Sequence, residues 1–141
     1  MLISESHFTS QTYFKINRFD TIAANHPDNR AHAGAAILIK SSIKYEVLDP
    51  FEEPHLQAAG IRVKSNNYFL NIFSIYFPPR HNVKCQQYDD FFQNLGSKFI
   101  VGGDFNAKHP WRGSRLANPK GKELYKCIQK NHYLSLSTGK P

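Results

Sequence analysis

The chain has 141 residues, of which 40% are hydrophobic and 21% are charged, so it is neither disordered nor too short for one domain with a hydrophobic core, which we expect over residues 1–141. Lys and Arg outnumber Asp and Glu by 18 to 11, which gives a formal net charge of +7. This excess favours an anionic partner such as nucleic acid or a phosphorylated substrate.

Strands dominate the predicted structure. Runs rich in β-branched and aromatic residues predict strands at 19–24, 34–40, 43–48, 56–63, 68–77 and 99–104. The run 68–77 is apolar on both alternating faces, as expected of a central strand that is covered on both sides. Asn66 and Asn67 predict a tight turn, so residues 56–77 are expected to form an antiparallel hairpin.

Helices are predicted later in the chain. Aromatic and apolar residues recur at spacings of three and four between Tyr88 and Leu95, and Gly96 ends this segment. Residues 120–130 place apolar side chains on one face and lysines on the other. Strands combined with a few covering helices predict an α+β or layered α/β domain.

Cysteine and histidine give weaker signals. Cys85 and Cys127 fall in the predicted helices without paired spacing, and we interpret them as reduced core thiols. The seven histidines are dispersed, which argues against a compact zinc cage and leaves their individual roles open. Residues 1–3 are followed at once by polar residues, and no apolar run reaches membrane-spanning length, so we expect an intracellular protein with no membrane partner.

The most informative motif follows the strand predicted at 99–104. Residues two apart on a strand point the same way, so Asp104 and Asn106 are expected to share one face while Phe105 turns toward the core. A carboxylate can hold a divalent metal or orient water, and the neighbouring amide can bond a phosphate oxygen. A strand that ends in a plain Gly-Gly-Asp turn is the alternative.

Glu5 and Tyr76 complete a possible site. Glu5 also follows an apolar strand end, where it is either a metal ligand or an exposed acid. Tyr76 lies where the central strand is about to end at Pro78, so its hydroxyl either reaches the same edge as Asp104 or serves only core packing. These residues form one site only if their strand ends meet at one edge.

Basic residues are densest immediately after Asn106. Lys108, Arg112 and Arg115 lie where a phosphate backbone would pass and are candidates for substrate binding. Trp111 and Tyr125 could stack on bases, although packing is the interpretation we favour for Trp111.

The motifs around Glu5, Tyr76 and Asp104, in this order and spacing, resemble the endonuclease/exonuclease/phosphatase superfamily. The segments Trp111 to Arg115, Asn118 to Leu124 and Ser137 to Pro141 are similar to the apurinic-type endonuclease domain of jockey-like non-LTR retrotransposons. This resemblance implies a DNase I-like, four-layered β-sandwich with flanking helices, incomplete at both termini.

The resemblance also implies residue roles. Glu5 is the metal ligand for Mg²⁺ or Mn²⁺, Tyr76 a hydroxyl of the phosphate or metal site, Asp104 the residue that positions the attacking water, and Asn106 a phosphate contact. His7 and His109 lie beside matched motifs and receive only supporting roles, with a purely structural role for the imidazole of His109 left open.

The implied reaction is the nicking of target DNA by phosphodiester hydrolysis, which primes a reverse transcriptase domain of the same polyprotein. We expect a monomer that acts in the nucleus. Family members carry an Asn strand upstream of the Glu motif and a Ser-Asp-His segment downstream, neither of which lies within residues 1–141. We therefore expect an incomplete copy with weak or no turnover.

Other functions stay open at this point. The basic cluster could belong to a non-catalytic relic that binds nucleic acid, in which case binding would depend on salt and ignore metal. A small-molecule phosphoesterase of the same superfamily is another alternative, against which the region from Trp111 to Pro141 argues. A degenerate fragment that does not fold stably is the last.

Overall fold

The computed structural model describes residues 1–13 and 15–136. The chain divides into two compact units, each of which is described by itself. The sheet unit comprises Met1–Pro78 and Gly96–Phe105, and the helical unit comprises Pro79–Leu95 and Asn106–Pro141. Within the described residues, no helix has the length and apolar character needed to cross a membrane.

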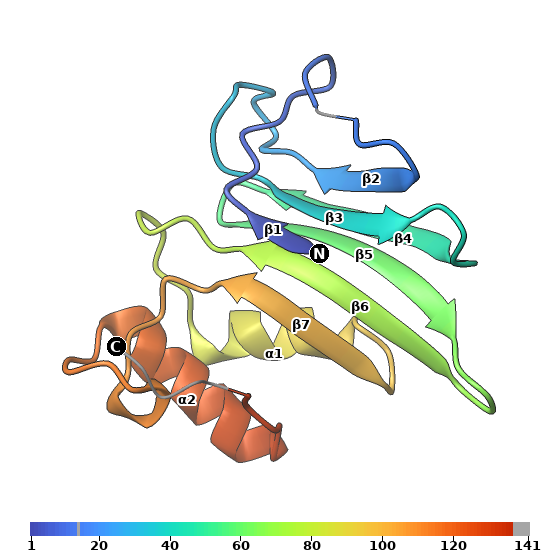
Figure 1. Cartoon of the computed structure of the whole chain (residues 1–141). Helices are drawn as coiled ribbons and strands as arrows, with labels where there is room; N and C mark the ends of the chain where they lie inside the picture. The colour runs from blue at the N-terminus through green and yellow to red at the C-terminus, as the bar shows by residue number, and fades with distance from the viewer. Residues whose placement is uncertain (14, 137–141) are drawn as a thin grey trace. The chain divides into compact units, whose positions relative to one another are not determined.

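Two sheets make up the sheet unit (Figure 1). In the first, β3 lies between β1 and β2, and both neighbours run antiparallel to it. In the second, the strand order is β4-β5-β6-β7, with β6 and β7 parallel and the other pairs antiparallel. The strand bounds are Leu2–Ser4 (β1), Phe19–Ala24 (β2), Ala35–Lys40 (β3), Glu46–Glu53 (β4), Leu56–Lys64 (β5), Phe69–Tyr76 (β6) and Phe99–Asp104 (β7).

A hydrophobic core joins the two sheets. Ile22 and Ile37 from the first sheet pack with Ala59 and Ile61 from the second, and all four side chains are buried. Burying each isoleucine side chain stabilises the fold by roughly 1.5–3 kcal/mol. The sheets therefore pack face to face, and β1 lies close enough to β6 and β7 to contact both.

Most predicted strands are confirmed within one or two residues at each end. The hairpin predicted over 56–77 is formed by β5 and β6, and the turn between them includes a hydrogen bond from the Ser65 N–H to the Tyr68 carbonyl. β6 lies between β5 and β7, as predicted for a central strand. This arrangement brings the C-terminal end of β6 beside the C-terminal end of β7, with Tyr76 opposite Asp104.

One strand differs from its prediction. The strand expected at 43–48 begins instead at Glu46, because Ile43 belongs to a turn in which its N–H donates to the Lys40 carbonyl. It continues to Glu53 past Pro50, where the pairing register shifts between Leu48 and Phe51. Proline is tolerated there because β4 is an edge strand with a bulge, which needs no ladder hydrogen bond from that residue.

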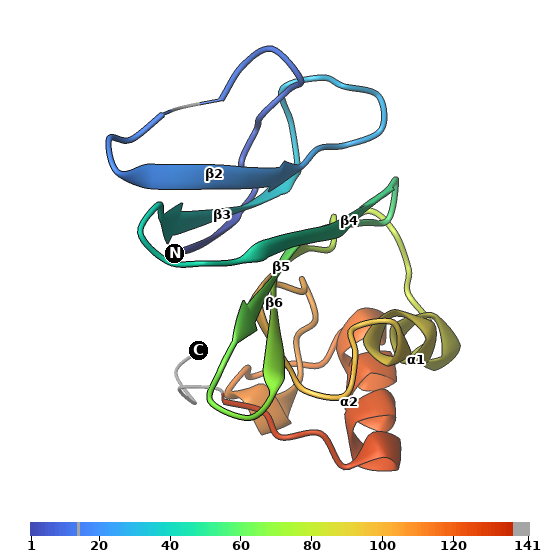
Figure 2. The same cartoon turned by 90° about the vertical axis from the view of Figure 1, so that its right-hand side faces the viewer.

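The helical unit contains α1 (Cys85–Gln93), the short 3-10 helix η1 (Pro110–Arg112) and α2 (Pro119–Asn131), and α1 packs beside α2 (Figure 2). Both predicted helices are confirmed, although α1 ends at Gln93, before Leu95 and Gly96. Asn118 caps α2 because its Oδ1 accepts a hydrogen bond from the Gly121 N–H at 2.7 Å. Pro119 follows at the first helical position, where its missing N–H costs nothing.

A buried carboxylate connects the two helices. Asp89 of α1 is 1% exposed and accepts hydrogen bonds from Lys130, Asn131 and the Cys127 thiol of α2. The Lys130 ammonium, with help from the other two donors, holds the pKa of Asp89 below its usual value. The prediction of reduced core thiols is met fully by Cys127, which is buried, whereas Cys85 is half-buried.

This carboxylate makes the helical unit sensitive to acid. A group whose pKa is lower in the folded state contributes stability above its unfolded pKa, near 3.8, and loses it as the pH falls through the folded pKa. We expect the midpoint of thermal unfolding, followed by helical circular dichroism, to fall more steeply from pH 5 to pH 2.5 in the wild type than in Asp89→Asn. An equally steep fall in both proteins would contradict this role, and the exposed neighbour Asp90→Asn serves as the matched control.

Candidate active site at the ends of three strands

The first contact of the site joins β6 to the segment after β1. The Tyr76 hydroxyl donates a hydrogen bond of 2.9 Å to Oε1 of Glu5. Tyr76 is 5% exposed and lies at the end of β6, whereas Glu5 is exposed and follows directly after β1. Two residues that are 71 positions apart in sequence are thus brought together at the edge where three strands end.

Ser4 fixes Asp104 at the same edge. The Ser4 hydroxyl donates to the Ile75 carbonyl at 2.7 Å and accepts from the Asp104 N–H at 2.9 Å. The Phe77 N–H donates to the Asp104 carbonyl at 2.9 Å, which extends the parallel pairing of β6 and β7 by one residue. The backbone of Asp104 is therefore held on both sides, while its side chain lies at the exposed surface.

The electrostatic surroundings keep the Tyr76 hydroxyl protonated. Burial is the main cause, followed by the hydrogen bond to Glu5 and by the negative charges of Glu5 and Asp104, and together they raise the pKa of Tyr76 to about 12. At neutral pH, Tyr76 is a hydrogen-bond donor and neither a base nor a nucleophile. The negative charges of Glu5 and Asp104 both raise the pKa of Tyr76, so both carboxylates lie near its hydroxyl group.

The backbone around Glu5 is held in an unusual conformation. Glu5 and His7 have φ angles of 53° and 57°, in the left-handed region that residues other than glycine rarely adopt. Each such residue costs on the order of 1–3 kcal/mol. The Ser6 and His7 N–H groups donate to the carbonyls of Gly34 and Ala33, and these bonds hold the segment in place. Glu5 is thus presented by a strained turn, as is common at functional sites.

Asn106 does not share a strand face with Asp104. β7 ends at Asp104, and Asn106 has a φ angle of 48°, so the alternation of side chains that predicted a common face stops before it. Phe105 behaves as expected, because its ring stacks on Phe77 with centroids 5.6 Å apart. Asn106 belongs to the helical unit.

Asn118 organises the backbone around Asn106. Its Nδ2 donates to the Asn106 carbonyl at 2.9 Å, and its Oδ1 accepts from the N–H groups of Lys108 and Gly121. The residue that caps α2 therefore also fixes the conformation of residues 106–108. Asn118 was not among the predicted site residues, although the Asn-Pro pair at the start of a helix is the sequence signal that marks it.

His109 and Trp111 have structural roles in the helical unit. Nδ1 of His109 accepts from the Trp111 N–H and caps η1, and its ring stacks on Tyr125 with centroids 4.3 Å apart. Trp111 also packs on Tyr125, at 5.6 Å. The interpretation of Trp111 as a packing residue is therefore the better one, and the structural alternative for His109 is favoured over a role in chemistry.

The remaining candidates are divided between the two units. His7 is exposed in the sheet unit, on the strained segment that also carries Glu5. Lys108 and Arg115 are exposed and Arg112 is half-buried in the helical unit. The segment Ser137 to Pro141, which carries part of the predicted resemblance, lies outside the described residues.

Comparison with known proteins identifies the family. The family described as "Endonuclease-reverse transcriptase" matches residues 70–141, just over half of the chain. The RNA-directed DNA polymerase from the mobile element jockey of Drosophila funebris is 32% identical over 141 residues, and the probable RNA-directed DNA polymerase from the transposon X-element of Drosophila melanogaster is 32% identical over 142. Both alignments cover all of this chain, which spans only 15% and 16% of those relatives.

A solved structure supports the fold. The endonuclease domain of TRAS1, a telomere-specific non-LTR retrotransposon, superposes with a TM-score of 0.65 over 82% of this chain and 53% of that domain, at 19% sequence identity. The prediction of an α+β fold built on two packed sheets is confirmed by this match and by the sheet topology. With the family match over residues 70–141, the resemblance to non-LTR retrotransposon endonucleases is confirmed, and the chain belongs to the endonuclease-reverse transcriptase family.

Proposed function

We propose that this chain nicks DNA by metal-dependent phosphodiester hydrolysis, as the endonuclease portion of a non-LTR retrotransposon polyprotein. The observation that carries the proposal is the meeting of Glu5, Tyr76 and Asp104 at one strand edge, with the Tyr76 hydroxyl bonded to Glu5. The family supports the reaction class, and the names of the relatives, RNA-directed DNA polymerases, support a reverse transcriptase domain as the partner in the same chain.

The donor set suits a hard divalent cation. Glu5 and Asp104 offer carboxylate oxygens and Tyr76 a phenolic oxygen, and Mg²⁺ and Mn²⁺ prefer such ligands over nitrogen or sulfur. Glu5 is the residue assigned to hold the ion. When bound, the ion supplies positive charge that stabilises the charge developing on the phosphate.

The side chains of the site have different roles in the proposed reaction. Asp104 positions the attacking water and accepts its proton, while the water oxygen bonds to phosphorus and the bond from phosphorus to the 3′ oxygen breaks. The departing 3′ oxygen takes a proton from solvent and leaves as a 3′ hydroxyl. Tyr76, protonated at neutral pH, donates its hydrogen bond to Glu5 and so holds this carboxylate at the edge where phosphate binds. Asn106 contacts a phosphate oxygen, and Lys108, Arg112 and Arg115 bind the DNA backbone. As part of the same proposal, this reaction takes place in the nucleus.

The test is nicking of supercoiled plasmid with protein in excess over DNA, because turnover by this stretch alone is expected to be slow. We expect nicking that requires Mg²⁺ or Mn²⁺, stops with EDTA and falls at least about a hundredfold in Glu5→Gln. The exposed Glu53→Gln on β4 is the matched control and should nick like the wild type. Equal nicking by Glu5→Gln and the wild type would show that Glu5 is not the metal ligand.

A measurement of Mn²⁺ binding tests the metal site independently of the nicking reaction. Electron paramagnetic resonance of Mn²⁺ should show bound ion with the wild type and Glu53→Gln, and much weaker binding with Glu5→Gln. A folded chain that binds Mn²⁺ through Glu5 but leaves the plasmid intact would support the metal site and contradict nicking by this stretch alone. Faster hydrolysis of a phosphomonoester than of plasmid would contradict the DNA substrate.

A further inference from the structure

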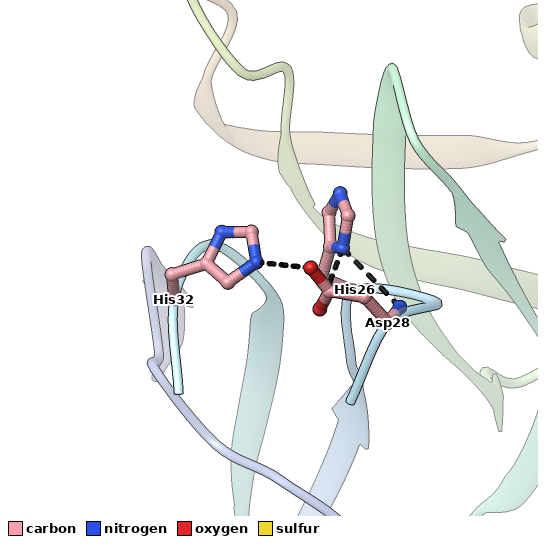
Figure 3. Close-up of side chains that lie close together, drawn as sticks. All are labelled: His26, Asp28 and His32. Carbon is pink, nitrogen blue, oxygen red and sulfur yellow. Dashed lines mark hydrogen bonds and ion pairs between the residues drawn. The ribbon is translucent and has the colours of Figure 1, made fainter. Parts of the chain in front are cut away.

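The loop between β2 and β3 brings together three potential metal ligands that lie outside the candidate active site. His26, Asp28 and His32 offer two imidazole nitrogens and a carboxylate whose ligand atoms all lie within 4.8 Å of one another. Nδ1 of His26 lies 2.9 Å from Oδ1 of Asp28, and Nε2 of His32 lies 2.8 Å from Oδ2 (Figure 3). The dispersal of histidines along the sequence argued against such a cluster, yet folding gathers two of the seven.

The spacing of these atoms matches a transition-metal site. Three ligands at about 2.0–2.1 Å from a tetrahedral zinc ion lie about 3.3–3.4 Å from one another. The separations between Asp28 and each histidine, 2.9 and 2.8 Å, need to open slightly to reach that value, and the two histidine nitrogens already lie within 4.8 Å of each other. The two rings lie 4.4 Å apart between centroids.

The loop is held in shape by residues that are not ligands. Asn29 has a left-handed φ of 54°, and its side chain both accepts from the Ser10 N–H and donates to the Ser10 hydroxyl. The Asn25 N–H donates to Oε1 of Glu52 at 2.8 Å. The three ligand side chains therefore start from a braced loop, which lowers the ordering cost of binding an ion.

The carboxylate of Asp28 and the exposure of the cluster also suit metal binding. Asp28 offers two carboxylate oxygens, one facing each of the two histidines. The His26 side chain is 15% exposed, whereas Asp28 and His32 are 38% and 47% exposed, so an ion can enter from solvent and keep a water as its fourth ligand.

We propose that His26, Asp28 and His32 form a Zn²⁺ site, independent of the proposed nuclease reaction. Zinc fits better than Mg²⁺ because two of the three donors are imidazoles, which suit zinc, whereas Mg²⁺ prefers oxygen ligands. The site has a structural consequence, since the loop runs directly into Ala33 and Gly34, whose carbonyls hold the segment that carries Glu5. Zinc would thus brace this segment without touching DNA.

Titration with Zn²⁺ tests the proposal. Isothermal titration is carried out in millimolar Mg²⁺, so that the oxygen ligands around Glu5 are already occupied. We expect one Zn²⁺ per chain, with the dissociation constant raised at least about tenfold in His32→Gln and in Asp28→Asn. His81→Gln, at an exposed histidine outside the loop, should bind like the wild type. The absence of stoichiometric binding, or equal binding by His32→Gln and the wild type, would overturn the proposal.

A cobalt spectrum tests the site by a signal that is gained, so that a variant that loses zinc binding because it misfolds cannot be mistaken for support. His32→Cys replaces one ligand by a thiolate, and Co²⁺ bound to it should show an ultraviolet charge-transfer band from sulfur to cobalt. His81→Cys carries the same number of thiols and should lack the band, which controls for Cys85 and Cys127. The band in both variants, or in neither, would contradict a metal site at His32.

Discussion

Replacement of Asp104 by Asn is expected to slow metal-dependent nicking of supercoiled plasmid at least about a hundredfold, because an amide cannot accept the proton of the attacking water. The side chain is nearly isosteric and lies at the exposed surface, so the fold should survive the change. The Ser4 and Phe77 bonds to the Asp104 backbone do not involve the carboxylate and should persist. The measurement is the single-turnover rate of conversion from supercoiled to open-circular DNA.

The matched control is Asp49→Asn, which removes the same charge from an exposed position on β4. Affinity for DNA should change little in either variant, since Asp104 contributes to the reaction and the basic residues to binding. If Asp104→Asn nicks as fast as Asp49→Asn, the assignment of Asp104 is wrong. If Asp104→Asn also loses its near-ultraviolet circular dichroism, the residue supports the fold and not the reaction.

Gly103→Ala is expected to damage both the sheet and the site. Gly103 has a φ of 142°, and a Cβ atom there would lie 2.1 Å from the Ile75 carbonyl oxygen and 2.8 Å from the Ser4 hydroxyl. The carbonyl is backbone of β6, so it can give way only if β6 and β7 separate. We expect a loss of at least about 2 kcal/mol in the free energy of unfolding, from backbone strain together with overpacking.

The neighbouring Gly102→Ala provides the comparison for this effect. A Cβ atom at Gly102 would meet only the end of the Leu2 side chain, which can rotate away. Urea unfolding should therefore show a much smaller loss for Gly102→Ala, and Mn²⁺ binding should weaken in Gly103→Ala alone. Equal losses in the two variants would mean that β7 tolerates a side chain at Gly103 and that the close approach to Ile75 is relieved by small movements.

The elements that depend on local patterns were predictable. β2 and β7 match their predicted ranges because a run of β-branched and aromatic residues forms a strand whichever strand it pairs with. β4 was misplaced because its edge position and its bulge, which allow Pro50 within a strand, depend on its partner β5. Local sequence carries no information on that partner.

The candidate site was also predictable only in part. The sequence pointed to Glu5, Tyr76 and Asp104 as acids and a hydroxyl at strand ends, but their meeting depends on sheet pairing across 71 residues. The common face predicted for Asp104 and Asn106 was wrong because strand geometry ends at Asp104. Ser4 was missed because a serine in a short strand has no distinguishing signal, and the His26 cluster because a loop has no fixed period that would align its ligands.

The bond from the Asp104 N–H to the Ser4 hydroxyl spans 100 residues and sets the order in which the site is assembled during synthesis. Ser4 is synthesised 100 residues before Asp104. Its strand can pair with β3 in that interval, but its hydroxyl cannot accept the Asp104 N–H until Asp104 has been made. At roughly 5–20 residues per second, that interval is on the order of 5–20 s. Throughout it, the segment carrying Glu5 is present without β7, so the strand edge at which Glu5, Tyr76 and Asp104 meet is completed only after β7 has been translated.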